Sequence, residues 1–442
     1  MIPLLAVLVT TSLPAPSEPG DRADTAFTYM VGGVRVIQQI DTSTRLAAVG
    51  VYLLGGTTLL TPMTAGIENL FLDAAARGSK AYPRGMGTVA LARTGTRETF
   101  AMEEDWTAIW LQGFAEDIDS SWAVLADELV RPTLSDTLVA LARDGLLAAA
   151  RARYEDPEQR IKALAESVMF AGHPYAVDPR GNPTSLSALS ADDVRNFDRT
   201  ELVGSRLMVV VVGNVTKEHL TALVQSTLGS LPIGSYHWSL PPALPYREGK
   251  PGWTVEHRPL PTTYLLGYCT GPQPSEPLYW PFRIANSLYS GWLGGSIRGE
   301  GLSYEAYAPF LDRALPVGGF AMSTSAPDKA FPLAIEALND LSELQIGSEE
   351  TTDESGQRWF WYSRQVRRDY LNDLRDAQST VLGTVEVLAR AQLFFGNYRK
   401  VGALLPNSGA FNDRALANAA ALCKSRIQYA YLGDTTRMRG KW

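Results

Sequence analysis

The side chains that most often catalyse reactions are sparse in this sequence. No G-x-S-x-G motif occurs, and Ser296 and Ser303 have no histidine nearby, which argues against a serine hydrolase. The segment Gly85-Met86-Gly87 lacks the strand–helix context of a nucleotide-binding loop and is typical of a turn. Two cysteines exclude a thiolate-rich zinc or iron–sulfur site, and four histidines are few for a metalloenzyme of this length. These residues are Cys269, Cys423, His173, His219, His237 and His257.

The helix pattern over residues 65–77 carries two carboxylates. Glu68 and Asp73 are separated by about 140° around a helix and therefore point in different directions. One interpretation makes Glu68 a solvated charge at the helix start and Asp73 a polar surface residue. The alternative pairs Asp73 with Asn69, one turn earlier, to bind a cation weakly or to form a hydrogen bond. An arc of about 100° predicts the core face, and it holds Met63, Ile67, Leu70, Phe71 and Ala74.

Length and charge limit the classes of protein to consider. With 442 residues the chain is expected to form two or more domains, and 45% hydrophobic residues are ordinary for a globular protein. The net charge of −7, without a basic run, argues against nucleic-acid binding, because neutralisation of phosphates supplies most of that affinity. No apolar stretch is long enough for a transmembrane helix.

The N-terminus resembles an export signal. An apolar run over residues 2–13 precedes a segment rich in Pro and Ser, although no basic residue comes before it and no clean cleavage site follows. Residues 1–25 are therefore expected to be either a signal for export, to the periplasm or a similar compartment, or an untranslocated, frayed N-terminus. An exported chain permits a bridge between Cys269 and Cys423; otherwise Cys269 is expected to be a buried free thiol.

A segment rich in Pro and Gly at residues 230–252 divides the chain. The expected organisation is an N-terminal domain at 26–232, a linker at 233–252 and a C-terminal domain at 253–442. Gly113-Phe114-Ala115 and Gly319-Phe320-Ala321 are each expected to end a strand that precedes a helix, which suggests a duplication. The order of elements predicts an α+β fold of two duplicated α/β sandwiches, each a sheet with helices on one face.

Local patterns predict the individual elements. Asp156-Pro157-Glu158 is a strong helix start, with an N-cap Asp and Pro in the first turn. The strands expected are residues 34–38, 47–54, 100–112, 207–212, 262–268, 304–311 and 317–325. The helices expected are residues 65–77, 122–130, 135–154, 157–170, 216–228, 279–297 and 331–344.

Nearly the whole mature chain resembles the pitrilysin/insulinase family, the inverzincin metallopeptidases with an H-x-x-E-H helix. The resemblance rests on VGVYLLGGTTLLTPMTAGIENLFLDAAARGSKAYPR, on HPYAVDPRGNPTSLSALSADDVRNF, on LMVVVVGNVTKEHLTALVQSTLGSLP and on SIRGEGLSYEAY. It implies a fold like that of the mitochondrial processing peptidase and of LuxS/metallohydrolase sheets, with two α+β units enclosing a chamber.

The resemblance also shows what this chain lacks. In the family, two histidines one turn apart bind zinc, and a glutamate between them acts as the base for the metal-bound water. The matching positions here are Asn69, Leu72 and Asp73, and the third ligand, a glutamate, is matched by Ala149, or by Ala148 if the alignment slips by one. No zinc is expected in this chain, since an amide, an apolar side chain and a lone carboxylate do not form a zinc site.

A second family motif is retained. Arg298 and Tyr304 match the Arg/Tyr pair of the family's second domain, with an interval one residue shorter than the commoner form. In active relatives this pair reaches into the site of the opposite domain or subunit, where the guanidinium binds substrate carbonyls and the phenol stabilises the oxyanion. The plainer interpretation is that Arg298 is a surface charge at a helix end and Tyr304 a half-buried strand aromatic.

The resemblance implies three functional hypotheses. The leading one is a non-catalytic, substrate-binding subunit that pairs with a zinc-bearing chain as a heterodimer, binds an extended peptide and completes the partner's site through Arg298 and Tyr304. The second is a structural or scaffold subunit without a role in proteolysis. The third is a self-sufficient peptidase with an unrecognised site, against which the scarcity of histidines argues.

Overall fold

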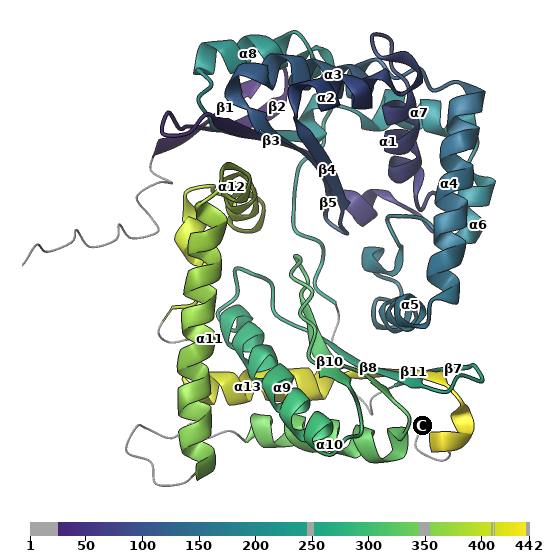
Figure 1. The fold of residues 1–442 in the computed structure, drawn as a ribbon, viewed down its shortest axis with the longest axis vertical. Coiled ribbons are helices and arrows are strands. Elements are labelled where there is room, and N and C mark those ends of the chain that lie inside the picture. The colour runs from purple at the N-terminus through teal and green to yellow at the C-terminus, as the bar shows by residue number, and fades with distance from the viewer. Residues whose placement is uncertain (1–24, 245–251, 344–353, 408–409, 411, 439–442) are drawn as a thin grey trace, which may run out of the picture.

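The computed structural model describes residues 25–244, 252–343, 354–407, 410 and 412–438. Almost all of the expected export segment, residues 1–24, lies outside these ranges. Two mixed β-sheets lie one above the other, with helices outside and between them (Figure 1). We call the chain before the 233–252 connection the first half and the chain after it the second half.

The first sheet belongs entirely to the first half. Its six strands are ordered β1-β2-β6-β3-β5-β4, and only β2 and β6 run parallel. The central strands β3 and β6 are buried along nearly their whole length, so this sheet needs cover on both faces. The strands are β1 Ala26–Val31, β2 Val34–Ile40, β3 Leu46–Leu54, β4 Arg97–Met102, β5 Trp106–Phe114 and β6 Leu207–Gly213.

The second sheet belongs entirely to the second half. Its five strands are ordered β7-β11-β8-β10-β9, with β7 and β11 parallel and the other pairs antiparallel. Buried residues again fill both faces of the central strands β8 and β10. The strands are β7 Trp253–His257, β8 Thr263–Thr270, β9 Glu305–Tyr307, β10 Val317–Thr324 and β11 Gln428–Gly433.

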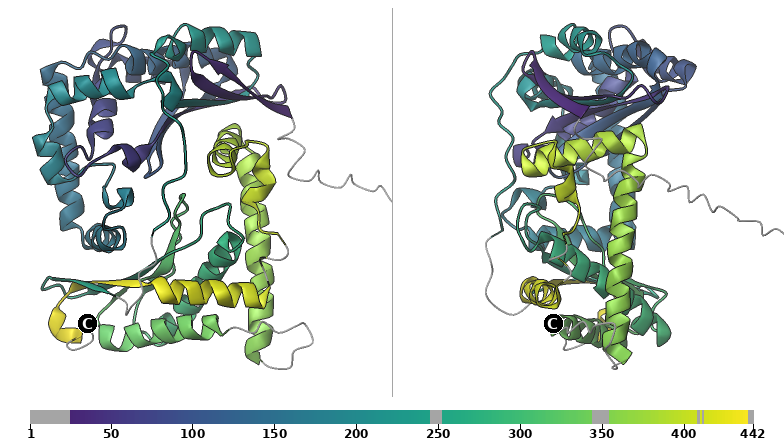
Figure 2. Two further views of the ribbon diagram at one scale, coloured as in Figure 1. Left: turned by 180° about the vertical axis from the view of Figure 1, so that it is seen from behind. Right: turned by 90° about the vertical axis from the view of Figure 1, so that its left-hand side faces the viewer.

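The helices of each half cover mainly the outer face of that half's sheet (Figures 1 and 2). In the first half they are α1 Ile67–Arg77, α2 Met86–Thr94, α3 Ile118–Val130, α4 Asp136–Glu155, α5 Pro157–Met169, α6 Pro183–Ala188, α7 Ala191–Glu201 and α8 Lys217–Gln225. In the second half they are α9 Tyr279–Gly299, α10 Pro327–Ser342, α11 Glu354–Gln378, α12 Val381–Phe395 and α13 Asp413–Arg426. None of the helices that the structure describes has the length and apolar character needed to cross a bilayer.

The two halves exchange one helix each. Helix α12 of the second half packs on the inner face of the first sheet, where Val385 and Leu388 join a core with Ile37 and Val210. Helix α5 of the first half packs on the inner face of the second sheet, with Ile161 in a core that includes Leu266, Tyr268 and Val317. The expected fold class of two α/β sandwiches is confirmed, but helices cover both faces of each sheet, because both faces are apolar.

Several local predictions are confirmed. Helix α5 begins at the Asp156-Pro157 signal, and the Asp156 carboxylate accepts hydrogen bonds from the backbone N–H groups of Glu158 and Gln159. The run Val209–Val212 lies in a fully buried strand. Both signals are local, so sequence alone was sufficient to find them.

Other local predictions are wrong. The strand expected at 100–112 is a hairpin, β4 and β5, which turns at residues 103–105. Met63 lies before α1 and is exposed rather than part of the core face, and Met86 and Gly87 open α2 rather than forming only a turn. Gly319-Phe320-Ala321 lies inside β10, whereas Gly113 and Phe114 end β5, so the two matched triplets occupy different places in their strands.

The helix exchange predicts that α12 contributes strongly to stability. Leu388 is 1% exposed in the core between α12 and the first sheet. Replacing it, Leu388→Ala, should lower the free energy of unfolding in urea by about 2–5 kcal/mol, because the core loses apolar contact and gains a cavity. The control Leu141→Ala, at a leucine 52% exposed on α4, should change it by less than about 0.5 kcal/mol. Equal losses for the two variants would contradict the packing of α12.

Candidate functional site

A cavity of about 1050 Å³ lies between the two sheets, and both halves line it. The first half contributes Tyr52 and Trp110 from the first sheet, together with residues of α4 and α5. The second half contributes Tyr268 from β8, and Tyr307 with the segment 309–313 after β9. The cavity has the size of a large ligand site, and its walls combine aromatic rings with charged side chains.

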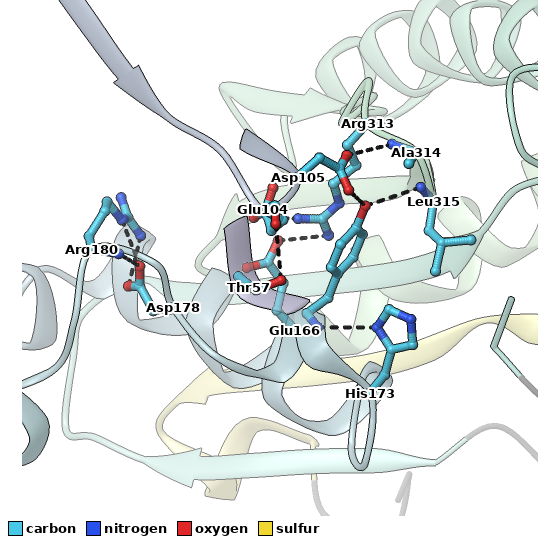
Figure 3. A network of polar contacts seen from close by, with 11 residues as sticks. Thr57, Glu104, Asp105, Glu166, His173, Asp178, Arg180, Arg313, Ala314 and Leu315 are labelled. Carbon is cyan, nitrogen blue, oxygen red and sulfur yellow. Dashed lines mark hydrogen bonds and ion pairs between the residues drawn. The ribbon is translucent and has the colours of Figure 1, made fainter. Parts of the chain in front are cut away.

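A buried polar network joins the halves at the wall of this cavity (Figure 3). The Asp105 carboxylate, in the β4–β5 turn, accepts hydrogen bonds from the Tyr175 hydroxyl at 2.5 Å and from the Ala314 backbone N–H at 2.9 Å. The guanidinium of Arg313 forms ion pairs with Glu104 at 2.5 Å and with Glu166 of α5 at 3.2 Å. One turn of the second half is therefore held by three carboxylates of the first half.

Burial changes the acidity of these carboxyl groups. It raises the pKa of Asp105 to about 6, although the hydrogen bonds from Tyr175 and Ala314 oppose this change. Burial also raises the pKa of Glu166, against the opposing charge of Arg313. No local pattern predicts this network, because its members stand in no recognisable motif and meet only in the fold. They are Glu104, Asp105, Tyr175 and Arg313.

The three positions that match the zinc helix do not converge on one point. The Asn69 side-chain amide is buried and donates a hydrogen bond to the backbone carbonyl of Arg180 at 3.1 Å. The Asp73 carboxylate pairs with Arg77, one turn later on α1, at 2.9 Å. Leu72 is partly buried against the core of the first half. Asn69 and Asp73 thus have separate partners, and the hydrogen bond expected between them as one alternative does not form.

The segment 178–182 packs tightly against the start of α1. A Cβ atom on Gly66 would lie 2.7 Å from the Cα atom of Gly181, and both glycines have positive φ, 86° and 83°. An ion pair between Asp178 and Arg180 at 3.0 Å braces the segment (Figure 3). The face of α1 that carries Asn69 is therefore covered by the chain itself.

The residue matched to the third zinc ligand also has no ligating side chain. Ala149 and Ala148 are exposed on α4, whereas Ala150 is buried and lines the cavity. Of these three alanines, only Ala150 lies on the wall of the cavity. Among the residues that the structure describes, no three His, Cys, Asp or Glu side chains are grouped closely enough to hold a metal ion.

The prediction that Glu68 is a solvated charge is wrong. Glu68 is 5% exposed, and its carboxylate forms an ion pair with Arg206 at 2.9 Å and accepts a hydrogen bond from Thr107. Arg206 also donates from Nε to the backbone carbonyl of Leu54 at 2.9 Å. This buried pair fixes α1 to the first sheet from 138 residues away in sequence, a distance at which no local pattern reveals it.

Arg298 and Tyr304 lie together at the surface, outside the cavity wall. Arg298 is in the last turn of α9, and its guanidinium carbon lies 5.9 Å from the centre of the Tyr304 ring. Tyr304 is 88% exposed, so the half-buried environment of the plainer interpretation is wrong. Ser303 anchors this segment, because its hydroxyl oxygen lies 2.7 Å from the backbone carbonyl oxygens of both Glu305 and Ser323, which share its single proton.

The two cysteines form a disulfide. Cys269 at the end of β8 and Cys423 of α13 are bonded, and both are buried. The expectation of a free thiol at Cys269 is therefore wrong, and the alternative pairing holds. His173 is buried, and its ring bonds to the Pro242 carbonyl at 2.9 Å and to the Tyr175 N–H at 3.1 Å.

Comparisons with known proteins agree with this geometry. Residues 188–348 match the family described as "Peptidase M16 inactive domain". A protein of Mycobacterium leprae named an uncharacterized zinc protease is 23% identical over 385 residues, which cover 85% of this chain and 83% of that protein. The mitochondrial-processing peptidase subunit beta of Blastocladiella emersonii is 20% identical over 270 residues, 61% of this chain and 57% of its own.

A solved structure shares the fold. The crystal structure of a "peptidase M16 inactive domain" from Pseudomonas fluorescens aligns with a TM-score of 0.78 at 14% identity, over 93% of this chain and 98% of that one. The architecture is thus that of the M16 peptidases and their inactive relatives. The chain is a homologue of the M16 family, the pitrilysin/insulinase peptidases, and its described residues contain no zinc-binding group.

The buried ion pair predicts an asymmetry between two acidic residues of α1. Glu68→Ala should lower the free energy of unfolding by about 3–5 kcal/mol, because Arg206 is left buried without its main carboxylate partner. Asp73→Ala, which removes a partly exposed pair with Arg77, should cost less than about 1 kcal/mol. Urea unfolding of both variants measures the difference. If Glu68→Ala were as mild as Asp73→Ala, the buried position of Glu68 would be incorrect.

The Asp105 carboxyl predicts how stability depends on pH. Its pKa is higher in the folded chain than in the unfolded one, so its contribution is fully present below about pH 4 and is lost as pH rises through about 6. The loss is on the order of 3 kcal/mol. Urea unfolding across this range should show a shallower decline for Asp105→Asn, with the remaining slope due partly to Glu166. Parallel profiles for the two proteins would refute the assignment.

Proposed function

We propose that this chain is the substrate-binding, non-catalytic subunit of a two-chain metallopeptidase. The observation that carries the proposal is the surface pair of Arg298 and Tyr304, retained in a chain whose zinc-helix positions hold Asn69, Leu72 and Asp73. A homologue that serves only as a scaffold has no chemical reason to keep an exposed arginine and an exposed tyrosine stacked together. The partner is a chain with an intact H-x-x-E-H helix.

The exposure of the pair supports action on another chain. Tyr304 and Arg298 project from the surface beyond the cavity wall, where a partner subunit can receive them. The Arg298 guanidinium can hold two carbonyl oxygens of an extended peptide, and the Tyr304 hydroxyl can donate to an oxyanion. The hydrogen bonds of Ser303 fix the segment, so Tyr304 is held in place before a partner arrives. One relative, the processing peptidase of Blastocladiella emersonii, is itself named as a subunit.

The residues at the zinc-helix positions of this chain do not fit a zinc ion. The amide of Asn69 is already bonded to Arg180, Leu72 has no ligand atom, and Asp73 is paired with Arg77. Ala150, which lines the cavity, has no ligand atom in its side chain either. In this proposal the metal therefore belongs to the partner, and the role of this chain is to bind and orient the peptide.

Export to the periplasm or a comparable oxidising compartment is part of the proposal. The Cys269–Cys423 disulfide supports it, because structural disulfides persist where thiols are not kept reduced. The apolar run at residues 2–13 is a second, independent support.

The test uses the purified chain alone and mixed with an M16 chain from the same source that retains H-x-x-E-H. We expect no stoichiometric zinc and no cleavage of β-casein by this chain alone, and cleavage by the mixture. Arg298→Ala should reduce the kcat/KM of the mixture at least about 10-fold, since a charged hydrogen bond contributes roughly 1.5–3 kcal/mol. Tyr304→Phe should lower kcat in particular.

The control is Arg199→Ala, which removes an exposed arginine of α7 in the other half and should leave the activity of the mixture unchanged. Full activity with both Arg298→Ala and Tyr304→Phe would favour the scaffold hypothesis. Stoichiometric zinc and cleavage by this chain alone would establish a self-sufficient peptidase instead.

A further inference from the structure

Most cations on the wall of the cavity are paired with carboxylates, but Arg153 of α4 and Lys162 of α5 are not. Among the described residues, no Asp or Glu side chain lies within ion-pair distance of either group. The other cations of the wall form ion pairs: Arg160 with Glu256, Arg180 with Asp178, Arg313 with Glu104, and Arg390 with Asp312. A cation that lines a partly enclosed cavity without a counter-ion is a candidate contact for an anionic ligand.

The Arg153 guanidinium is held in place and remains reachable. Its Nη2 atom donates a hydrogen bond to the backbone carbonyl of Gly181 at 2.9 Å, which fixes the side chain against the segment 178–182. Its Nε and Nη1 atoms have no acceptor among the described residues, and neither atom is sealed from solvent. Ala150, one turn earlier on α4, lines the same cavity with a side chain too short to cover the guanidinium. Donors on both atoms therefore remain available to a ligand.

The charges next to Arg153 favour an anion. Burial lowers the pKa of Arg153; the charge of Asp178 opposes this change, and the charge of Arg180 adds to it. Asp178 is itself bound through both carboxylate oxygens by Arg180 (Figure 3). The guanidinium stays protonated at neutral pH, so its charge is partly desolvated without being neutralised. A carboxylate would neutralise it and accept charge-assisted hydrogen bonds, which a neutral carbonyl does less strongly.

The unpaired carboxylates of the cavity lie on other elements. Glu103 is in the β4–β5 turn and Glu386 is on α12, and neither is among the groups whose charge shifts the pKa of Arg153. Both would repel an anion from their own part of the wall, whereas Lys162 on α5 would attract it. An anionic group that enters the cavity is therefore favoured at the wall formed by α4, α5 and the segment 178–182.

We propose that Arg153 forms a subsite of the cavity that binds a carboxylate of the peptide substrate. The inference rests on the proposed function and deepens it, since it names a chemical group that this chain recognises. An Asp or Glu side chain and a C-terminal carboxylate present the same chemistry to the guanidinium, and the test separates these two sources. The substrate class is accordingly a peptide with an acidic group, bound through its charge rather than through its backbone alone.

The test is isothermal titration calorimetry of the full chain with an unlabelled, N-acetylated peptide. Versions of one otherwise uncharged sequence carry Glu or Gln at the centre and a free or an amidated C-terminus. The wild type should bind a version with a carboxylate at least about 10-fold more tightly than the uncharged version, since a hydrogen bond to a charged group contributes roughly 1.5–3 kcal/mol. A preference for Glu identifies a side chain as the source of the carboxylate, and a preference for the free acid identifies the C-terminus.

The variant Arg153→Gln removes the charge but keeps an amide donor for the Gly181 carbonyl, so the fold should be retained. It should bind the carboxylate peptide about 10-fold more weakly than the wild type does, and the uncharged peptide equally well. Arg153→Lys, which keeps the charge, should retain part of the preference. The matched control is Arg151→Gln, at an exposed arginine of α4 outside the cavity wall, which should bind both peptides as the wild type does.

The outcomes separate this inference from the proposed function. Absence of binding of every peptide version by the wild type would overturn the proposed function. Wild-type binding without a preference for a carboxylate would overturn this inference alone. The same holds for a preference that Arg153→Gln leaves intact, or that Arg151→Gln reduces equally.

Discussion

The structure depends on a shared constraint: each sheet is apolar on both faces, and the helices of its own half cover mainly the outer one. Helix α12 completes the first sheet, and α5 completes the second. Hydrophobic burial is not directional, but it must be contiguous, so the exchange fixes the separation and the orientation of the two sheets. The cavity is what remains of the space between them beside these two inserted helices.

Placement of the polar side chains follows from that arrangement. Once the sheets are held apart by α5 and α12, the β4–β5 turn and the segment 312–315 meet at the cavity wall, where water is partly excluded. Charged groups in such a place must be paired, and Arg313 with its carboxylates satisfies this requirement almost completely.

The limits of sequence reading are physical. The buried run of β6 and the capped start of α5 are local, and short stretches of sequence were sufficient to predict them. Helix periodicity gave the wrong environment for Glu68. The period describes only the faces of one helix, whereas Glu68 is buried by an arginine 138 residues away in sequence. The pairing of Cys269 with Cys423 was left as one of two alternatives for the same reason, because 154 residues separate them. The polar network at the cavity wall could not be predicted from local patterns either, since its members come from both halves of the chain.

The exchange of helices also has a consequence for the order in which the chain is made. The first sheet is synthesised by residue 213, but the helix that covers its inner face ends only at residue 395. Until then Ile37, Ala48 and Val210 face solvent on the growing chain, so the first half cannot mature as an independent unit on the ribosome. A nascent chain of this kind keeps apolar surface exposed, which chaperones bind, until most of its length has been synthesised.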